Sequence, residues 1–261
     1  MKTGLQGKRA LVTGAASGIG KAVACALAAE GVTVAVHARS EARAAETLQS
    51  IKSAGGNAVA VAADMERAEE IEAMCKQAIG KLGGIDIVVN NAGVADMSSV
   101  PDMDERLWDW IMNVNLKAPF LVCKHTLPTM IRQATGGSVL FTSSTNGKTA
   151  DADWSAYNAS KHGVIGFMRC LAAEVGKNNI RVNAVCPGWV ATKMADELHH
   201  KMADGAKRQF EQVYDESMRF NMLRSLIPAE DEADMYVYLA SNRGRNITGQ
   251  SINVCAGLCY W

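Results

Sequence analysis

The sequence predicts an α/β fold with a doubly wound parallel sheet of about seven strands and helices on both of its faces. Short runs of β-branched residues alternate with amphipathic, helix-like segments almost to the end of the chain. These runs lack strict polar alternation, which is typical of strands that are covered on both sides. No linker rich in Pro, Gly or Ser interrupts the 261 residues, so we expect one domain spanning residues 1–261.

The expected strands follow one another in a regular order along the chain. They cover residues 9–13, 33–37, 58–62, 85–89, 138–142, 181–185 and 251–254. Amphipathic segments lie between them, and the clearest carries an apolar stripe with steps of three and four: Ile71, Met74, Cys75, Ala78, Ile79 and Leu82. Helices that connect parallel strands cross over with a right hand, so this order predicts one continuous parallel sheet.

The order breaks over residues 193–227, where no strand signal occurs. Met194, Leu198 and Met202 begin a helix-like apolar stripe there, and further methionines follow it. The segment fits an ordinary packed helix pair. It also fits a mobile, substrate-covering segment, because thioether side chains adapt to varied apolar shapes. Its position after the sixth expected strand favours the cover.

The composition excludes several classes of protein. Lys plus Arg and Asp plus Glu each number 27, so the net charge is zero and we expect no binding to nucleic acid or to a membrane surface. Residues are 48% hydrophobic, yet no apolar stretch reaches membrane-spanning length and no secretory leader is evident, which predicts a cytoplasmic protein. The seven cysteines lie singly without a Cys-x-x-Cys pair. This pattern favours reduced, mostly buried thiols and predicts no metal site.

A glycine-rich turn follows the first expected strand and leads into a helix. Glycines permit a tight turn and a close approach of the backbone to an anion, while a helix N-terminus directs free N–H groups at a pyrophosphate. Many β-α turns use glycine for geometry only, but a position after the first strand of a β-α-β unit favours dinucleotide binding. The candidate residues are Gly14, Ser17, Gly18, Ile19 and Gly20.

The end of the second expected strand indicates which dinucleotide is bound. An acidic residue at this point would bind the ribose 2′-hydroxyl of NAD, but the sequence has Ala38 and Arg39. A small residue and a cation leave room and charge for the 2′-phosphate of NADP. Arg39 could instead cap an exposed strand end, and Ser17 does not supply the second cation that often occurs in NADP sites. We favour NADP(H) as the cofactor and retain NAD(H) as the alternative.

Ser144, Tyr157 and Lys161 are the candidate catalytic residues. Tyr157 and Lys161 are four residues apart, which on a helix places a phenol and an ammonium on one face. The cation favours the phenolate and lowers the pKa of the phenol. A hydroxyl from a separate segment can then hold a substrate oxygen against it. Such a pair also occurs by chance on surface helices, so its meaning depends on the rest of the chain.

Six short motifs follow one another along nearly the whole chain. They are Thr13-Gly14-x-x-x-Gly18-Ile19-Gly20, Asn90-Asn91-Ala92-Gly93, Asn113-Val114-Asn115, Ser143-Ser144 with Gly147, Tyr157-x-x-x-Lys161, and Pro187-Gly188 with Thr192. In these motifs and their order the chain resembles the short-chain dehydrogenase/reductase family, in its compact single-domain branch. The resemblance implies a Rossmann-like fold and an NAD(P)-dependent oxidoreductase.

The resemblance also implies a role for each catalytic candidate. Tyr157 would be the general acid/base that gives a proton to the carbonyl oxygen during reduction and takes it back during oxidation. Lys161 would lower the pKa of that phenol and hold the nicotinamide ribose, and Ser144 would position the substrate oxygen. Asn115 resembles the residue that holds a water relay to Lys161. Asn115 could also mend a helix irregularity, and the two roles are compatible.

Further cofactor contacts are implied in the same way. Asn91 would line the floor beneath the adenosine ribose, with Gly93 permitting a close approach. Asp64 would accept a hydrogen bond from the adenine amino group, although a plain helix N-cap is its alternative. Thr192 would bind the nicotinamide carboxamide. The remaining candidates for cofactor binding are Met65, Tyr157, Lys161, Pro187, Gly188 and Val190.

The C-terminal residues depart from the family pattern. Family members commonly end the last strand with an acidic residue and two glycines, whereas this chain has Cys255-Ala256-Gly257. The apolar, aromatic end Tyr260-Trp261 could pack in a subunit interface, approach the active site or simply be disordered. We expect His199 and His200 to be solvated, without a metal or catalytic role.

The sequence therefore predicts an oxidoreductase that interconverts a secondary alcohol and a ketone by hydride transfer. Walls expected from Trp154, Trp189 and residues 94–98 suggest a mid-sized, partly apolar substrate, while Asp151 and Asp153 could instead bind a hydroxylated or cationic group. The alternative is a catalytically silent nucleotide-binding protein of the same fold. The resemblance further implies a homotetramer, or a dimer, formed through the helix that carries the catalytic pair.

Overall fold

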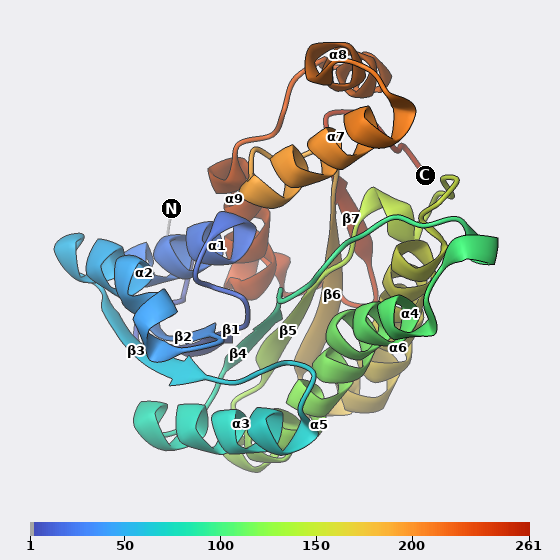
Figure 1. The fold of residues 1–261 in the computed structure, drawn as a ribbon. Coiled ribbons are helices and arrows are strands. Elements are labelled where there is room, and N and C mark those ends of the chain that lie inside the picture. Colours follow the sequence, from blue (N-terminus) through green and yellow to red (C-terminus); the bar gives the residue numbers. More distant parts are fainter. Residues whose placement is uncertain (1–2) are drawn as a thin grey trace.

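The computed structural model describes residues 3–261, which contain one sheet of seven parallel strands. The strands lie in the order β3-β2-β1-β4-β5-β6-β7 (Figure 1). Their bounds are β1 Arg9–Val12, β2 Thr33–Ala38, β3 Asn57–Ala62, β4 Ile87–Asn90, β5 Gly137–Thr142, β6 Ile180–Pro187 and β7 Ser251–Val254. Every expected strand is present, and the predicted doubly wound parallel sheet is confirmed.

Helices cover both faces of this sheet (Figure 1). On one face lie α1 (Gly18–Ala29), α2 (Glu41–Ser53) and α9 (Ala229–Ala240). On the other lie α3 (Ala68–Leu82), α5 (Ala118–Gln133) and α6 (Ser155–Val175), with α4 (Glu105–Met112) against α6. The chain is thus built of three layers, as a parallel sheet with helical connections requires.

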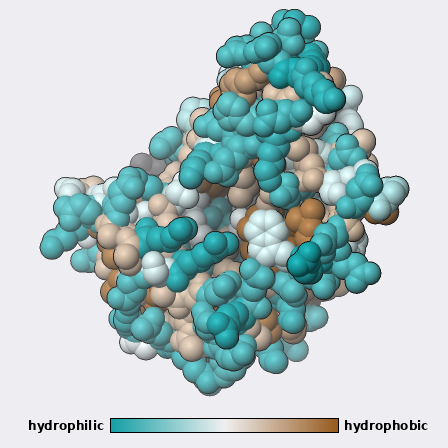
Figure 2. Space-filling model, in the orientation of Figure 1, coloured by the Kyte–Doolittle hydropathy of each residue, from teal (hydrophilic) through white to brown (hydrophobic). Residues whose placement is uncertain are grey.

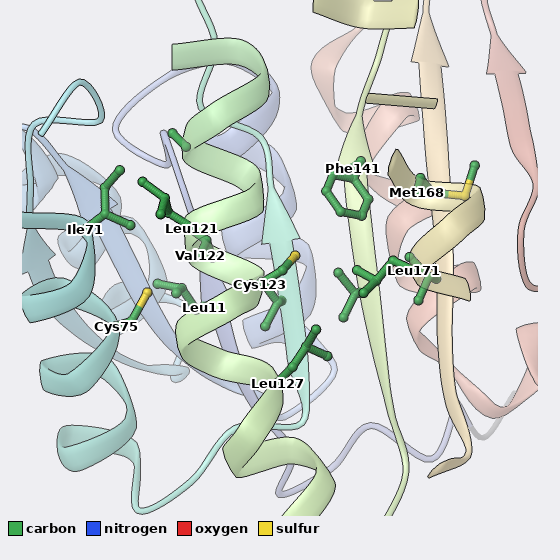
Figure 3. Close-up of a cluster of buried hydrophobic side chains, with 14 of the residues drawn as sticks. Leu11, Ile71, Cys75, Leu121, Val122, Cys123, Leu127, Phe141, Met168 and Leu171 are labelled. Atoms are coloured by element: carbon green, nitrogen blue, oxygen red, sulfur yellow. The ribbon is translucent and has the colours of Figure 1, made fainter. Parts of the chain in front are cut away.

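Each face of the sheet has its own hydrophobic core. In β1, Leu11 packs with residues of α3, α5 and α6, whereas Ala10 and Val12 pack with residues of α1 and α9. Figure 3 shows the first of these cores, where Phe141 of β5 lies near Met168 of α6. Because alternate residues of each strand enter opposite cores, the strands are apolar throughout, which explains the missing polar alternation in the sequence.

Helix α3 shows how the apolar stripe produces this packing. Its residues Ile71, Met74, Cys75 and Ala78 are all buried, because steps of three and four place them on the face that meets the sheet. The helix ends at Gly83, whose φ of 70° is left-handed. Glycine adopts this conformation without a Cβ penalty, so it stops the helix cleanly.

The carboxyl ends of the strands form the edge that carries the site. The strand order reverses between β1 and β4, and ligands of open α/β sheets bind in the crevice at such a reversal. Helices α7 (Lys193–Ala206) and α8 (Phe210–Phe220) stand over this edge, at the top of Figure 1. The segment without strand signals therefore forms a helix pair, which we call the lid.

Hydrophilic side chains cover most of the face drawn in Figure 2, and apolar ones gather near α7 and α8 and along the hollow beneath them. Within residues 3–261, no helix has both the length and the apolar character needed to cross a membrane.

Candidate active site

A cavity of about 980 Å³ lies at the carboxyl edge of the sheet, beneath the lid. Its walls come from the loops that follow the first six strands, from α7 and α8, and from the C-terminal residues. Every candidate site residue except Asn115 lines it. They are Gly14, Ser17, Gly18, Ile19, Gly20, Arg39, Asp64, Met65, Asn91, Gly93, Ser144, Tyr157, Lys161, Pro187, Gly188, Val190 and Thr192. The topology thus gathers residues from nearly the whole chain in one crevice.

The glycine-rich turn after β1 is shaped for a close approach to a ligand. Gly14 and Gly18 have φ angles of 64° and 53°, which favour glycine. A Cβ at Gly14 would lie 2.8 Å from the Cα of Ala92, so the turn packs directly against the loop after β4. Ser17 is the N-cap of α1, but its side chain makes no capping hydrogen bond. The first turn of α1 therefore keeps N–H groups for an anion, and the cradle fits a pyrophosphate.

His37 fastens this turn to the neighbouring strands. Its Nδ1 accepts a hydrogen bond of 3.0 Å from the N–H of Gly14, and its Nε2 lies 3.1 Å from the carbonyl oxygen of Ala63. These partners require the neutral ring with its proton on Nε2. Burial lowers the pKa of His37, which keeps the ring neutral at pH 7. Nothing in the sequence marks His37 for this role, because the contact depends on the register of β1 against β2.

Replacing His37 by alanine should therefore weaken cofactor binding without touching the catalytic pair. The change leaves the N–H of Gly14 and the carbonyl of Ala63 without their partner, at a cost of roughly 1–3 kcal/mol. We expect the Tm to fall and the Kd for NADPH to rise about tenfold, as measured by thermal unfolding and fluorescence titration. His125→Ala, outside the cavity, is the matched control. An unchanged Kd in His37→Ala would contradict the role.

Two arginines stand at the end of β2. Arg39 and Arg43 both line the cavity, and Arg43 lies in the first turn of α2. The sequence pattern marked only Arg39 at this place, and Arg43 adds a second cation at the same end of the cavity. Glu41 lies between them in the sequence, but its carboxylate is 3.6 Å from the Nζ of Lys81. This pairing partly offsets the negative charge that Glu41 brings close to the two arginines.

Asp64 and Met65 follow β3 and line the same end of the cavity. The Oδ1 of Asp64 accepts a hydrogen bond of 3.0 Å from the N–H of Glu66. Helix α3 begins only at Ala68 and has Arg67 as its N-cap. The alternative of Asp64 as the N-cap of this helix is therefore wrong: Asp64 closes a short turn before the helix and keeps its carboxylate at the cavity wall.

Asn91 braces the floor of the cavity. Its Nδ2 donates to the main-chain oxygens of Thr13 at 3.0 Å and Gly14 at 3.2 Å. Its Oδ1 accepts a hydrogen bond of 3.1 Å from the hydroxyl of Thr142, which also lies 2.6 Å from the phenolic oxygen of Tyr236. Asn91 therefore holds the glycine-rich turn in place relative to β5 and α9 while it lines the cavity.

Ser144, Tyr157 and Lys161 meet in this cavity. The Nζ of Lys161 lies 5.5 Å from the centre of the Tyr157 ring and donates a hydrogen bond of 2.9 Å to the main-chain oxygen of Thr142. Ser144 follows β5 and caps the short 3₁₀ turn Thr145–Gly147. The helical spacing and the strand-end loop thus bring the predicted three side chains to one place.

Burial governs the charges of the pair. It raises the pKa of Tyr157, while a side-chain hydrogen bond with Ser144 lowers it to a smaller extent. Burial also lowers the pKa of Lys161 to about 8. The expectation that Lys161 lowers the pKa of the phenol was therefore wrong for this arrangement: the pKa of Tyr157 is raised by burial, and the opposing effect comes from Ser144. At pH 7 the site holds a neutral phenol beside an ammonium, which is the protonation state that a proton donor to a carbonyl needs.

Asn115 lies behind the catalytic lysine. It belongs to the π-helical turn Asn113–Lys117 between α4 and α5, and its side-chain amide exchanges two hydrogen bonds of 2.8 Å with the backbone of Val94. A Cβ at Gly93 would be 3.4 Å from both the Oδ1 of Asn115 and the Nζ of Lys161. Asn115 therefore secures a helix irregularity beside Lys161, as one of its two expected roles requires.

The family model for short chain dehydrogenases matches residues 8–203 of this chain. The protein belongs to the short-chain dehydrogenase/reductase family. Its relatives in this family match over nearly their full length. The 3-oxoacyl-acyl-carrier-protein reductase of Staphylococcus aureus is 35% identical over 252 residues, which cover 96% of this chain and 98% of the relative. The D-beta-hydroxybutyrate dehydrogenase of Cupriavidus necator is 35% identical over 97% of this chain and 98% of its own.

A solved structure agrees with the same assignment. The crystal structure of an actinorhodin polyketide ketoreductase variant with NADPH superposes with a TM-score of 0.94. It is 35% identical in sequence, and the match covers 100% of both chains. The relatives are oxidoreductases that act on different substrates, so the comparison shows the family and its redox chemistry and leaves the substrate of this dehydrogenase to be inferred from its own cavity.

The lid of this short-chain dehydrogenase carries an aromatic cluster. His199 is fully buried, and its ring centre lies 4.2 Å from that of Trp189 and 5.4 Å from that of Tyr214. The expectation of a solvated His199 was therefore wrong, whereas His200 is exposed and stacks on Phe210 at 4.4 Å. Burial lowers the pKa of His199, so it acts as a neutral packing residue that joins α7 to α8.

An ion pair ties this lid to the opposite side of the cavity. The Nζ of Lys201 in α7 lies 2.8 Å from the Oδ2 of Asp96, in the loop after β4. Partly exposed pairs contribute up to about 1 kcal/mol. The contact therefore adds a small stabilisation to the packing of α7 against the loop after β4.

Proposed function

We propose that this short-chain dehydrogenase is an NADP(H)-dependent oxidoreductase that interconverts a ketone and a secondary alcohol. The observation that supports this most directly is the meeting of Ser144, Tyr157 and Lys161 in a cavity whose far end holds Arg39 and Arg43. The first group suits proton transfer at a carbonyl oxygen. The two arginines suit a 2′-phosphate.

The chain's own residues handle the proton and the developing charge. Bound NADPH would supply a hydride to the carbonyl carbon. The hydroxyls of Ser144 and Tyr157 would hold the carbonyl oxygen, and Tyr157 would give its phenolic proton to that oxygen as negative charge develops there. The Lys161 ammonium, beside the ring, would stabilise the phenolate that remains. In the oxidation direction Tyr157 would take the proton back.

The cofactor would lie along the carboxyl edge of the sheet. The glycine-rich turn would hold its pyrophosphate, Arg39 and Arg43 its 2′-phosphate, and Asp64 its adenine amino group. Met65, Asn91 and Gly93 would line the adenosine half of the site. Lys161 would hold the nicotinamide ribose, and Thr192 the carboxamide, beside the turn formed by Pro187, Gly188 and Val190. Asn115 would hold the water relay to Lys161. The lid would cover the substrate.

Turnover of NADPH distinguishes an active oxidoreductase from a catalytically silent nucleotide-binding protein of the same fold. The purified protein should consume NADPH in the presence of simple neutral ketones and form the matching alcohols, measured by absorbance and by mass spectrometry. Tight binding of NADPH without reaction toward any ketone of the panel would favour the silent alternative.

Ketone reduction should become slower as the pH rises above about 8. Because burial lowers the pKa of Lys161 to about 8, the ammonium loses its proton there and no longer stabilises the Tyr157 phenolate. The phenol itself stays protonated, since burial raises its pKa. We expect kcat for reduction to fall between neutral pH and pH of about 10, while the Kd for NADPH, measured in parallel, changes less. A flat or rising kcat over this interval would contradict the role of Lys161.

We also propose that the protein forms a homotetramer, or a dimer, through the face of α5 and α6. Phe120 of α5 is 45% exposed, and its ring centre lies 6.0 Å from that of Phe167 of α6. Together these rings offer an apolar, aromatic surface of the kind that subunit contacts use.

A further inference from the structure

We infer that the substrate is an uncharged ketone with an apolar body of aromatic size, extending from Tyr157 to a rim formed by the lid and the C-terminal residues. This inference rests on the proposed function and concerns the class of substrate. It is carried by three observations: the distribution of charge in the cavity, an exposed apolar rim continuous with it, and the way that rim is anchored.

Positive charge in the cavity lies on the cofactor side. Arg39 and Arg43 stand at the end of β2, and Lys161 lies in the centre. Lys193, the first residue of α7, also lines the cavity, but its side chain is 88% exposed and lies 3.5 Å from a carboxylate oxygen of Glu197. The residue before it, Thr192, lies beside the glycine-rich turn: a Cβ on Gly18 would be 3.2 Å from its methyl group.

The substrate side of the cavity is apolar and aromatic. Among the described side chains that line this side, Asp151 is the one with a formal charge, and its carboxylate accepts a hydrogen bond of 2.9 Å from the side chain of Asn146. A substrate with negative charge on its apolar body would therefore meet the Asp151 carboxylate on this side. The lining cations Lys161 and Lys193 lie in the centre of the cavity and in an exposed pair with Glu197, so the desolvation of such a substrate would be poorly compensated. The apolar lining consists of Val94, Trp154, Trp189, Met194, Leu198, Met202, Phe220, Met222, Leu258, Tyr260 and Trp261.

Four of these residues form an exposed apolar rim at the cavity mouth. Phe220, Met222, Tyr260 and Trp261 are 73%, 66%, 73% and 63% exposed, although all four line the cavity. An apolar patch of this kind marks a place where an apolar ligand or partner binds. The rim is continuous with the cavity that holds Tyr157, which favours the body of a substrate whose carbonyl lies at Tyr157.

The two parts of the rim are joined to each other. The N–H of Leu223, next to Met222 in the lid, donates a hydrogen bond of 3.1 Å to the carbonyl oxygen of Ala256. Gly257 permits this approach, because a Cβ there would lie 2.6 Å from the Cβ of Met222. The last turn of the lid and the C-terminal residues therefore form one wall.

Lys148 anchors this wall to the catalytic loop. Its Nζ donates to the main-chain oxygen of Ser251 and to the Oδ1 of Asn253, both at 2.7 Å, and to the main-chain oxygen of Trp261 at 3.2 Å. Asn253 in turn donates a hydrogen bond of 2.8 Å to the carbonyl oxygen of Cys259. Lys148 lies between Ser144 and Tyr157 in the sequence, so the aromatic end is fixed relative to the catalytic residues. A rim held in place before binding loses little entropy when it receives a substrate.

The charge preference is tested with two ketones that share the same aryl-butanone body and differ in one ring substituent. One is phenyl-substituted butanone with a methyl ester on the ring, and the other carries the free carboxylate at the same position. With NADPH as reductant, kcat/KM for the ester should exceed that for the carboxylate by at least about tenfold, because a carboxylate in the apolar half loses its hydration without a partner. Equal values for the two ketones would overturn the inference.

The role of the rim is tested with variants. Phe220→Ala and Trp261→Ala should each lower the ratio of kcat/KM for the aryl ketone to that for butanone about tenfold, since each removes an aromatic contact that only the larger substrate reaches. Leu223→Ala is the matched control, because Leu223 is 75% exposed beside the rim but does not line the cavity. It should leave this ratio unchanged.

The outcomes separate the inference from the proposed function. If none of butanone, the aryl ester and the aryl carboxylate is reduced, the proposed function fails, whereas reduction of the carboxylate alone overturns only the inference. If butanone and the aryl ester are reduced but the rim variants leave the ratio unchanged, the inference alone fails. Light scattering on the same variants tests whether the rim binds a second copy of this chain instead of a substrate. If Trp261→Ala and Leu223→Ala lose assembly while the ratio of kcat/KM values stays unchanged, the rim is a subunit contact and the proposed substrate class is overturned.

Discussion

Replacing Tyr157 by phenylalanine should lower kcat for ketone reduction by several orders of magnitude. General acid catalysis contributes roughly 10²–10⁴-fold to such reactions, and Tyr157 is the phenol that lies with Ser144 and Lys161 in the cavity. The substitution keeps the ring, and with it the edge-to-face contact with Trp154 at 5.5 Å. The loss should therefore come from the missing proton and not from altered packing. Steady-state kinetics with a simple ketone and NADPH give the measurement.

Two controls make this result specific. NADPH should bind Tyr157→Phe with nearly the Kd of the intact protein, because the variant retains both arginines and the glycine-rich turn. Tyr238→Phe removes a phenol that is 41% exposed and outside the cavity, and it should react normally. Near-normal turnover in Tyr157→Phe would show that another group supplies the proton and would overturn the assignment.

Removing the two arginines at the end of β2 should change the preference between cofactors. A hydrogen bond to a charged partner contributes about 1.5–3 kcal/mol, and every 1.4 kcal/mol corresponds to about a factor of ten in Kd. Arg39→Ala should therefore weaken NADPH about tenfold to a hundredfold, and the double variant with Arg43→Ala should weaken it further. NADH lacks the 2′-phosphate, so its Kd should change little.

The control for these variants removes a cation of α2, the helix that carries Arg43, at a position outside the cavity. Lys52→Ala provides it, because Lys52 lies in the last turn of α2 and does not line the cavity. Isothermal titration of NADPH and NADH against all variants gives the ratio of the two Kd values. If that ratio is the same in the intact protein and in the arginine variants, the arginines do not read the 2′-phosphate and the preference for NADP(H) is wrong.

The strands could be predicted from the sequence because burial on both faces of the sheet requires continuous runs of apolar residues. Runs of β-branched residues are apolar throughout wherever alternate side chains enter two cores, as Leu11 and Val12 do. The ends of the strands depend instead on neighbours. β6 continues to Pro187, past the expected end at residue 185, because Cys186 and Pro187 pair with Asn253 and Val254 of β7. No local signal in residues 186–187 could reveal this register.

The catalytic candidates could be placed together from the sequence for two reasons. Parallel strands end at the same edge of the sheet, and residues four apart on a helix share one face. Arg43 was missed although a signal existed: it lies four residues after Arg39, in the first turn of the helix that follows. His37 and Lys148 were missed for a different reason. Their partners lie far away in the sequence, Gly14 for His37 and Trp261 for Lys148, and such contacts exist only after the sheet has formed.

His199 is a residue whose burial could not be predicted from the sequence. A histidine in a charged helix is usually exposed, yet Trp189 and Tyr214 enclose this one. The prediction failed because the helix pair folds back on itself and buries one face of α7 against α8. The pattern of a single helix does not show which of its faces a neighbouring helix will cover.

The most direct test of the account follows one hydride and its acceptor. The intact protein is given NADPH with deuterium at the transferable position of the nicotinamide ring and a phenyl-substituted butanone, and the product alcohol is analysed by mass spectrometry. We expect an alcohol with one deuterium on the carbinol carbon, formed at a rate that Tyr157→Phe lowers by several orders of magnitude. An alcohol without deuterium, or formation of the labelled alcohol at the same rate in Tyr157→Phe, would contradict it.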